Sequence, residues 1–317
     1  MNHKTIYRAV LTFTLLASLV FGVFMTLSIA QSADGTINDI NAYSADKVKF
    51  FNLISWLYSV CLIGFLFFTF VYKSKFAKSL KFSSKIYKKI CILGGCTALG
   101  VVLYSVVAEF VILPNVYYPD DFNSVEAFYR LIRRSEVSSS PNYSYILLIL
   151  ITAAAAFYFF SCAFSNQNKA SIRFTYLSLL PTMGLAAKLI FDFLMQNSNG
   201  YGQLYNYHLL SLGFFLLFFM NESRVYMRRA APALYVFFGL AGVLSAAVFA
   251  IPVLFLSITG IANASAANIV FCIADIAIIS YVYLRLYNLD IKIPKATKEG
   301  VLIEDCPEPK ENEQTKE

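Results

Sequence analysis

Long apolar runs separated by short polar connections make up most of this chain. Eight runs are long enough to consider, near residues 9–30, 51–72, 89–113, 144–164, 174–195, 204–220, 232–257 and 264–287. A helix needs about 20 mostly apolar residues to cross a bilayer, and helices satisfy their own backbone polar groups inside lipid. The pattern therefore predicts an all-α, polytopic integral membrane helix bundle with about eight transmembrane helices over residues 1–293. The polar segment 294–317 is expected to be a disordered cytoplasmic tail.

The composition agrees with the membrane class. Hydrophobic residues make up 58% of the chain and charged residues only 14%, whereas a soluble domain carries about 25% charged residues. The net charge of +7 could suggest nucleic acid, but the basic residues gather beside the apolar runs, where they set membrane orientation. The expected partner is thus the lipid bilayer, and no nucleic acid is expected.

The positions of the basic residues predict which connections face the cytoplasm. Most of the 26 Lys and Arg residues fall in or at the edge of the N-terminus and residues 73–88, 165–173, 221–231 and 285–317. The exceptions are Lys47, Lys49, Arg130, Arg133, Arg134 and Lys188. Because short cytoplasmic loops are enriched in Lys and Arg, both ends of the chain are predicted to be cytoplasmic. Ser28 to Ala30 resembles a signal-cleavage site, but the first apolar run exceeds the usual 7–15 residues of a signal peptide, which favours an uncleaved helix.

Two connections have patterns of their own. In 73–89, lysines recur at helical spacing, which allows a basic amphipathic helix on the inner leaflet; the alternative is that they only enforce orientation. In the outer loop 114–143, a capping-box pattern and a one-sided apolar spacing predict a short amphipathic helix. Arg130, Arg133 and Arg134 fall at the C-terminal end of this outer helix. It could be a lid, a surface for docking a partner, or an anchor on lipid headgroups.

Four ionisable side chains fall within the predicted spans: Glu109, Lys188, Asp192 and Asp275. A charge near the bilayer centre costs about 2.5–3.5 kcal/mol on insertion scales, so it usually has a partner or a function. Lys188 and Asp192 are four residues apart and could pair on one helix face, or Lys188 could reach Asp275 instead. The cluster is either a structural ion pair that fixes helix register or a proton- or ion-responsive site that opens outward. In a third interpretation, Glu109 and Asp192 reach the lipid interface.

Other residues have more ordinary interpretations. His208, at the outer start of the sixth run, is expected to be an interfacial polar tip. Pro181 and Pro252 lie within predicted helices and are expected to kink them, while Gly239 and Gly242 allow close helix packing. The six cysteines form no CxxC pair and there are only two histidines, so no metal or cofactor is expected.

Two short stretches carry a resemblance to known proteins. Residues Phe191 to Phe193 and Phe218 to Arg224 resemble segments of uncharacterised multi-pass membrane proteins of Gram-positive bacteria. The resemblance implies a bacterial plasma membrane and names no activity.

Three functions remain in competition at this stage. The first is a non-enzymatic membrane module that senses a ligand or docks with a membrane-protein partner or a second copy of the chain. The second is a small-solute or ion transporter that uses Lys188, Asp192 and Asp275. The third, an intramembrane enzyme, has the least support because the chain shows no HExxH motif and no nucleophile–base pattern.

Overall fold

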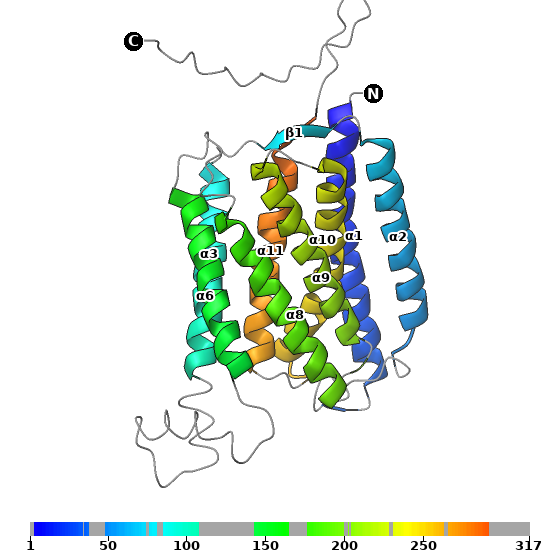
Figure 1. The fold of residues 1–317 in the computed structure, drawn as a ribbon. Coiled ribbons are helices and arrows are strands. Elements are labelled where there is room, and N and C mark those ends of the chain that lie inside the picture. The colour runs from blue at the N-terminus through cyan, green and yellow to red at the C-terminus, as the bar shows by residue number, and fades with distance from the viewer. Residues whose placement is uncertain are drawn as a thin grey trace, which may run out of the picture.

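The computed structural model of the chain describes residues 3–33, 35–37, 48–73, 76–80, 85–107, 143–164, 176–199, 202, 204–227, 231–262 and 266–291. Within these residues the fold consists of eight helices and one two-stranded sheet (Figure 1). The helices are α1 (His3–Ser32), α2 (Phe51–Val71), α3 (Lys85–Val107), α6 (Tyr143–Phe164), α8 (Leu179–Asn199), α9 (Leu204–Tyr226), α10 (Pro232–Ile258) and α11 (Ala266–Tyr287). The strands are β1 (Phe76–Leu80) and β2 (Leu289–Ile291). The predicted helical bundle is confirmed.

The bundle has the character of a membrane protein. Within the described part of the chain, six helices are long and apolar enough to cross a membrane: α1, α2, α3, α9, α10 and α11. In α6 and α8 the apolar stretches Ile149–Phe164 and Leu179–Ile190 are shorter. Six of the eight predicted spans therefore meet the length and composition that crossing requires.

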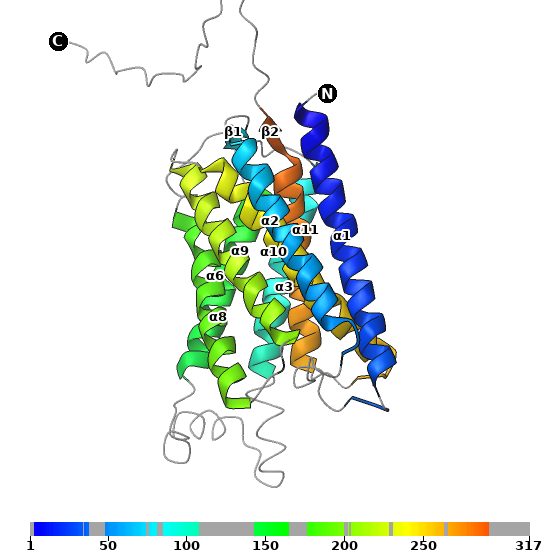
Figure 2. The same cartoon turned by 90° about the vertical axis from the view of Figure 1, so that its right-hand side faces the viewer.

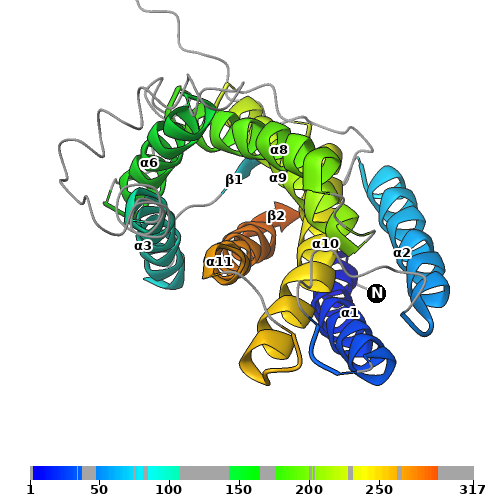
Figure 3. The same cartoon turned by 90° about the horizontal axis from the view of Figure 1, so that it is seen from below.

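Six of the helices form a closed ring. In the order α3, α6, α8, α9, α10 and α11, each helix packs on the next, and α11 packs back on α3 (Figure 3). α1 and α2 lie outside the ring, where both pack on α10. This arrangement makes α10 the most enclosed helix, and its residues 239–250 are buried without interruption.

Successive helices run in opposite directions, so the start of α1 and the end of α11 lie at the same end of the bundle (Figures 1 and 2). We call this the terminal end and the opposite one the distal end. At the terminal end the Tyr7 hydroxyl donates to the Leu286 carbonyl oxygen at 2.8 Å, and the Arg8 guanidinium lies 5.2 Å from the centre of the Tyr287 ring. The first and last helices are thus joined directly.

Backbone pairing links distant connections at both ends of the bundle. At the terminal end β1 and β2 are antiparallel, with Phe76 opposite Ile291 and Leu80 opposite Leu289. At the distal end the Ile37 amide donates to the Ile261 carbonyl oxygen at 2.9 Å. The amphipathic helix considered for 73–89 is therefore wrong for residues 76–80. Their backbone groups pair with a segment from the far end of the sequence, which lysine spacing cannot reveal.

Two other local predictions need correction. Pro181 lies in the first turn of α8, and a turn at Ser178 separates α8 from the helical residues 176–177, so the predicted helix over 174–195 is not continuous. The interruption just before Pro181 is where its missing N–H removes a backbone hydrogen bond. α9 continues six residues past the predicted boundary at 220. It does so because the polar residues there are buried and bonded within the helix: Asn221 Nδ2 donates to the Leu217 carbonyl at 2.8 Å, and Ser223 Oγ to the Phe219 carbonyl at 3.1 Å.

Glycines let α10 approach its neighbours closely, as their spacing predicts. A Cβ added at Gly242 would lie 2.7 Å from the Phe215 ring of α9, and one added at Gly239 would lie 2.9 Å from Leu286 of α11. On α1, a Cβ at Gly22 would lie 2.6 Å from Ile251 and 3.1 Å from the Ala247 carbonyl oxygen of α10. Backbone approach at these points leaves no room for a side chain.

Alanine substitution of two glycines should have opposite effects on stability. Gly22→Ala should lower the free energy of unfolding by about 1–3 kcal/mol, because overpacking forces α1 away from α10. Gly64→Ala on α2 has no atom within 4 Å of the added Cβ, so it should stabilise by about 0.5–1 kcal/mol through helix propensity. Thermal unfolding of both variants in detergent measures the difference, and equal midpoints would show that the α1–α10 contact is not tight.

Candidate functional site

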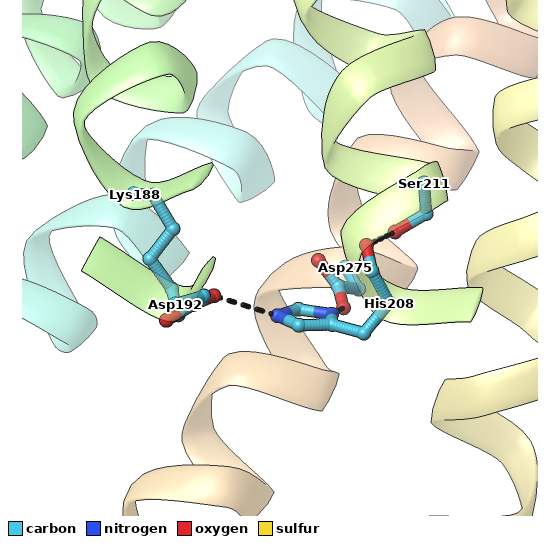
Figure 4. A network of polar contacts seen from close by, with 5 residues as sticks. All are labelled: Lys188, Asp192, His208, Ser211 and Asp275. Carbon is cyan, nitrogen blue, oxygen red and sulfur yellow. Dashed lines mark hydrogen bonds and ion pairs between the residues drawn. The ribbon is translucent and has the colours of Figure 1, made fainter. Parts of the chain in front are cut away.

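The structure brings three of the predicted charged residues together and does not describe the others. Lys188 and Asp192 lie on α8 and Asp275 lies on α11, and all three belong to one polar network (Figure 4). Four further predicted residues lie outside the described residues: Glu109, Arg130, Arg133 and Arg134. The outer amphipathic helix therefore stays a prediction.

The ion pair on α8 is the one that its spacing predicts. Lys188 Nζ lies 2.6 Å from Asp192 Oδ1 and 2.5 Å from Oδ2, one helical turn away. The same ammonium lies 4.0 Å from the centre of the Phe271 ring on α11. Asp192 is 3% exposed, so its negative charge is matched within the bundle and not by water.

A histidine joins this pair to the third carboxylate. His208 Nε2 lies 3.0 Å from Asp192 Oδ2, and His208 Nδ1 lies 3.2 Å from Asp275 Oδ2. The imidazole is 3% exposed and packs against the rings of Tyr205 on α9 and Phe249 on α10. The expectation that His208 is an exposed interfacial tip is therefore wrong. Its place in the second turn of α9 puts it inside the ring of helices, between two carboxylates on neighbouring helices.

The formal charge of this network depends on one proton. Asp192 and Asp275 carry two negative charges and Lys188 one positive charge, so a neutral His208 leaves the network at −1 and a protonated His208 makes it neutral. A neutral imidazole can donate from only one ring nitrogen, whereas the protonated ring donates from both. Since an unmatched buried charge is costly, the site is suited to take up one proton or one other cation.

A cavity of about 110 Å³ lies beside the network, between α3, α6, α8, α9 and α11. The part of the cavity nearer the distal end is lined by Lys188, His208, Phe271 and Asp275. Thr97 of α3 and Thr152 of α6 add hydroxyl groups, and the remaining lining is apolar. The cavity therefore has a polar part and a longer apolar part.

A second polar cluster lies nearer the terminal end, and sequence reasoning did not find it. Arg285 of α11 forms an ion pair with Glu222 of α9, and these side chains are 1% and 0% exposed. Arg285 Nε donates to the Tyr281 hydroxyl, which in turn donates to Glu222 Oε1, each at 3.0 Å. Tyr158 OH lies 3.1 Å from Tyr281 OH. The sequence assigned Glu222 and Arg285 to the cytoplasmic segments 221–231 and 285–317, because Glu222 follows one apolar run and Arg285 lies at the end of another. In the structure both lie within helices, α9 and α11, and are buried.

Aromatic side chains separate the cavity from the Glu222–Arg285 pair. Phe159 of α6 and Phe219 of α9 line the cavity, and both contact the Tyr281 ring, with centroids 5.1 and 5.6 Å away. The two phenylalanine rings are 6.0 Å apart. We refer to Phe159, Phe219 and Tyr281 as the aromatic layer. It closes the cavity on the side of the terminal end.

No group of three or more His, Cys, Asp and Glu side chains in the described part of the chain is arranged to hold a metal ion. Comparison of the chain with models of protein families, with curated proteins and with solved structures finds no match. The chemistry of the site must therefore be argued from its own residues.

Removal of one member of the α8 pair should damage the fold more than neutralisation of both. Lys188→Met leaves Asp192 buried without its main counter-charge, a change that costs about 3–5 kcal/mol in buried pairs. Adding Asp192→Asn removes that charge but keeps an oxygen and an amide near His208, so the double variant should recover stability. Unfolding midpoints in detergent test this, and a double variant less stable than Lys188→Met would exclude a buried pair.

Proposed function

We propose that the protein is a proton-coupled transporter of a small solute in a bacterial plasma membrane, with eight spans and both termini in the cytoplasm. The observation that carries the proposal is a buried histidine between two carboxylates, beside a cavity inside a ring of helices. Ionisable groups within membrane helices usually mark proton or substrate pathways. Histidine is also the side chain that ordinarily changes charge at physiological pH.

The membrane topology has support from charge and surface. Lys4, Arg8 and Lys73 lie at the terminal end, as expected if that end is cytoplasmic and rich in basic residues. Large apolar side chains are exposed on outward helix faces, among them Trp56 and Phe67 of α2, which suits contact with lipid. The 22 residues of α6 and 21 of α8 correspond to about 30 Å of helix, the thickness of the hydrocarbon core.

The arrangement of the two polar clusters favours transport. The His208 network adjoins the cavity, and the Glu222–Arg285 pair lies beyond the aromatic layer on the terminal side. Release of a solute to that side would require the aromatic layer to open and α9 to separate from α11. The polar part of the cavity, formed by Lys188, His208 and Asp275, would give a small solute its polar contacts.

A ligand-sensing membrane protein is the second candidate. Closure of the cavity by the aromatic layer favours it, because a sensor binds its ligand without releasing it across the bilayer. Docking of a membrane-protein partner or a second copy through Arg130, Arg133 and Arg134 stays a prediction.

Thiol labelling in intact cells tests the topology. Lys49→Cys, near the start of α2 at the distal end, should react with a membrane-impermeant thiol reagent. Lys73→Cys, just after α2 at the terminal end, should react only after the cells are opened. Both lysines are exposed, so accessibility within the fold does not separate them. The opposite labelling pattern would invert the orientation, and labelling of both in intact cells would exclude a span between them.

Transport is tested with purified protein in liposomes that contain a pH-sensitive dye. A panel of small amines, carboxylates and sugars is added against a preset pH gradient, and the expected result is solute-dependent proton flux through the wild type. His208→Gln and Asp275→Asn should slow this flux by about a hundredfold, the order that a positioned proton-transfer group contributes.

The matched control is Ser280→Ala on α11, whose hydroxyl bonds only to its own helix at Ile276 and which does not line the cavity. It should transport as the wild type does. Flux no greater than in protein-free liposomes for every solute would reject the transporter and favour a sensor.

A further inference from the structure

We propose that the cavity binds a small organic cation, a protonated amine with a short apolar body, and that this cation competes with the proton on His208. The inference concerns the same site as the proposed transport and names its substrate class. Binding can be measured without transport, so the two proposals can fail separately.

The acceptor for an ammonium group is Asp275. Its side chain is 5% exposed, it lines the cavity, and its Oδ2 atom has no hydrogen-bond partner among the described residues. His208 Nδ1 lies 3.2 Å away, and this contact is an ion pair only when the imidazole is protonated. The Asp275 carboxylate thus borders the cavity and has one imidazole beside it, so an N–H donor of a ligand in the cavity would supply a partner that a neutral His208 does not.

Lys188 does not supply this missing counter-charge. Its ammonium is held by both oxygens of Asp192, and this pairing neutralises it. Figure 4 shows Lys188 and Asp192 on one side of the His208 ring and Asp275 close to the other ring nitrogen. Asp275 therefore remains the carboxylate whose charge depends on His208 or on a ligand.

The rest of the cavity suits an apolar body attached to the cation. Val101, Leu185, Leu212 and Ile278 give aliphatic surface, and the rings of the aromatic layer close the far side. Aromatic faces attract cations, most strongly when water is excluded. An apolar cavity of about 150 Å³ holds benzene. The cavity here, of about 110 Å³, suits a narrower molecule, a short primary amine with n-butylammonium near the upper limit of size.

The proton on His208 and the organic cation exclude each other, because each would balance the same negative charge. With His208 neutral, the network carries one unmatched negative charge and binds a cation. With His208 protonated, the network is already neutral, so the charge of an added organic cation would be unmatched in an apolar surrounding. Where His208 is protonated before binding, uptake of one cation should thus release that proton; where His208 is already neutral, no proton should be released. The charged and titratable groups around His208 are Asp192 and Lys188 from α8, Asp275 and Cys272 from α11, and Tyr205 on α9 itself; α10 contributes the uncharged Phe249.

Calorimetric titration of the purified protein with n-butylammonium tests the inference, with protein-free micelles as the blank. Buffers with different ionisation enthalpies give the number of protons released, and the expected value rises toward one per bound cation as the pH is lowered and His208 is protonated before binding. Affinity should fall by up to about tenfold for each pH unit as His208 becomes protonated. Butyrate and 1-butanol, which match the probe in size but lack its positive charge, should bind at least about tenfold more weakly.

Three variants separate the roles of the residues. Asp275→Asn should weaken binding by about ten- to a hundredfold, while Asp275→Glu keeps the charge and should retain binding. His208→Gln should bind n-butylammonium without proton release and without dependence on pH in this range. Ser280→Ala, outside the cavity, should behave as the wild type, and each variant is compared by gel filtration and thermal unfolding.

Equal binding of 1-butanol or butyrate, cation binding to the wild type without proton release at any pH, or full binding by Asp275→Asn would each overturn the inference. Cation binding with proton release but no flux in liposomes would uphold the inference and reject transport. Proton flux with other solutes, without binding of n-butylammonium, would uphold transport and reject the inference.

Discussion

The requirement that buried charges be matched nearby governs how the helices of this bundle are held together. Asp192, His208 and Asp275 connect α8, α9 and α11 toward the distal end, and Glu222 with Arg285 connects α9 to α11 toward the terminal end. Because apolar side chains can pack in more than one register, we propose that these polar contacts specify the relative position of the three helices. The cavity exists between helices fixed in this way.

Much of the fold follows from the sequence, because apolar runs of sufficient length specify where helices form. The α2 and α10 boundaries agree with their apolar runs to within one residue. The α9 boundary does not, because Asn221, Glu222 and Ser223 are polar but buried, and hydropathy alone cannot distinguish a polar residue that ends a helix from one that bonds within the bundle. The pairing of β1 with β2 depends on segments distant in sequence and has no local signal.

The contacts of the candidate site are also of two kinds: contacts within one helix, which residue spacing can suggest, and contacts between helices, which it cannot. Lys188 and Asp192 pair within one helix, and their spacing of four residues suggested this contact, although the sequence left a pairing of Lys188 with Asp275 open. His208 meets Asp275 only because α9 packs in the ring of helices near α11, which no spacing within either helix indicates. The charges within the predicted spans give a partial indication of this contact. Asp192, Asp275 and Lys188 leave one negative charge without a partner, and the chain has only two histidines that could supply a positive charge.

The aromatic layer has a consequence for the electrical insulation of the membrane. Phe159 and Phe219, which face the cavity, offer no hydrogen-bonding groups, and the hydroxyl of Tyr281 belongs to the network of Glu222 and Arg285. Under the proposed function, a chain of water molecules that relays protons from His208 would be interrupted at the two phenylalanine rings. Under the proposed function, this arrangement would let His208 gain or lose a proton without opening a continuous proton path across the membrane. Any exchange with the terminal side would have to wait for the rings to move apart, which couples the passage of charge to a change of shape.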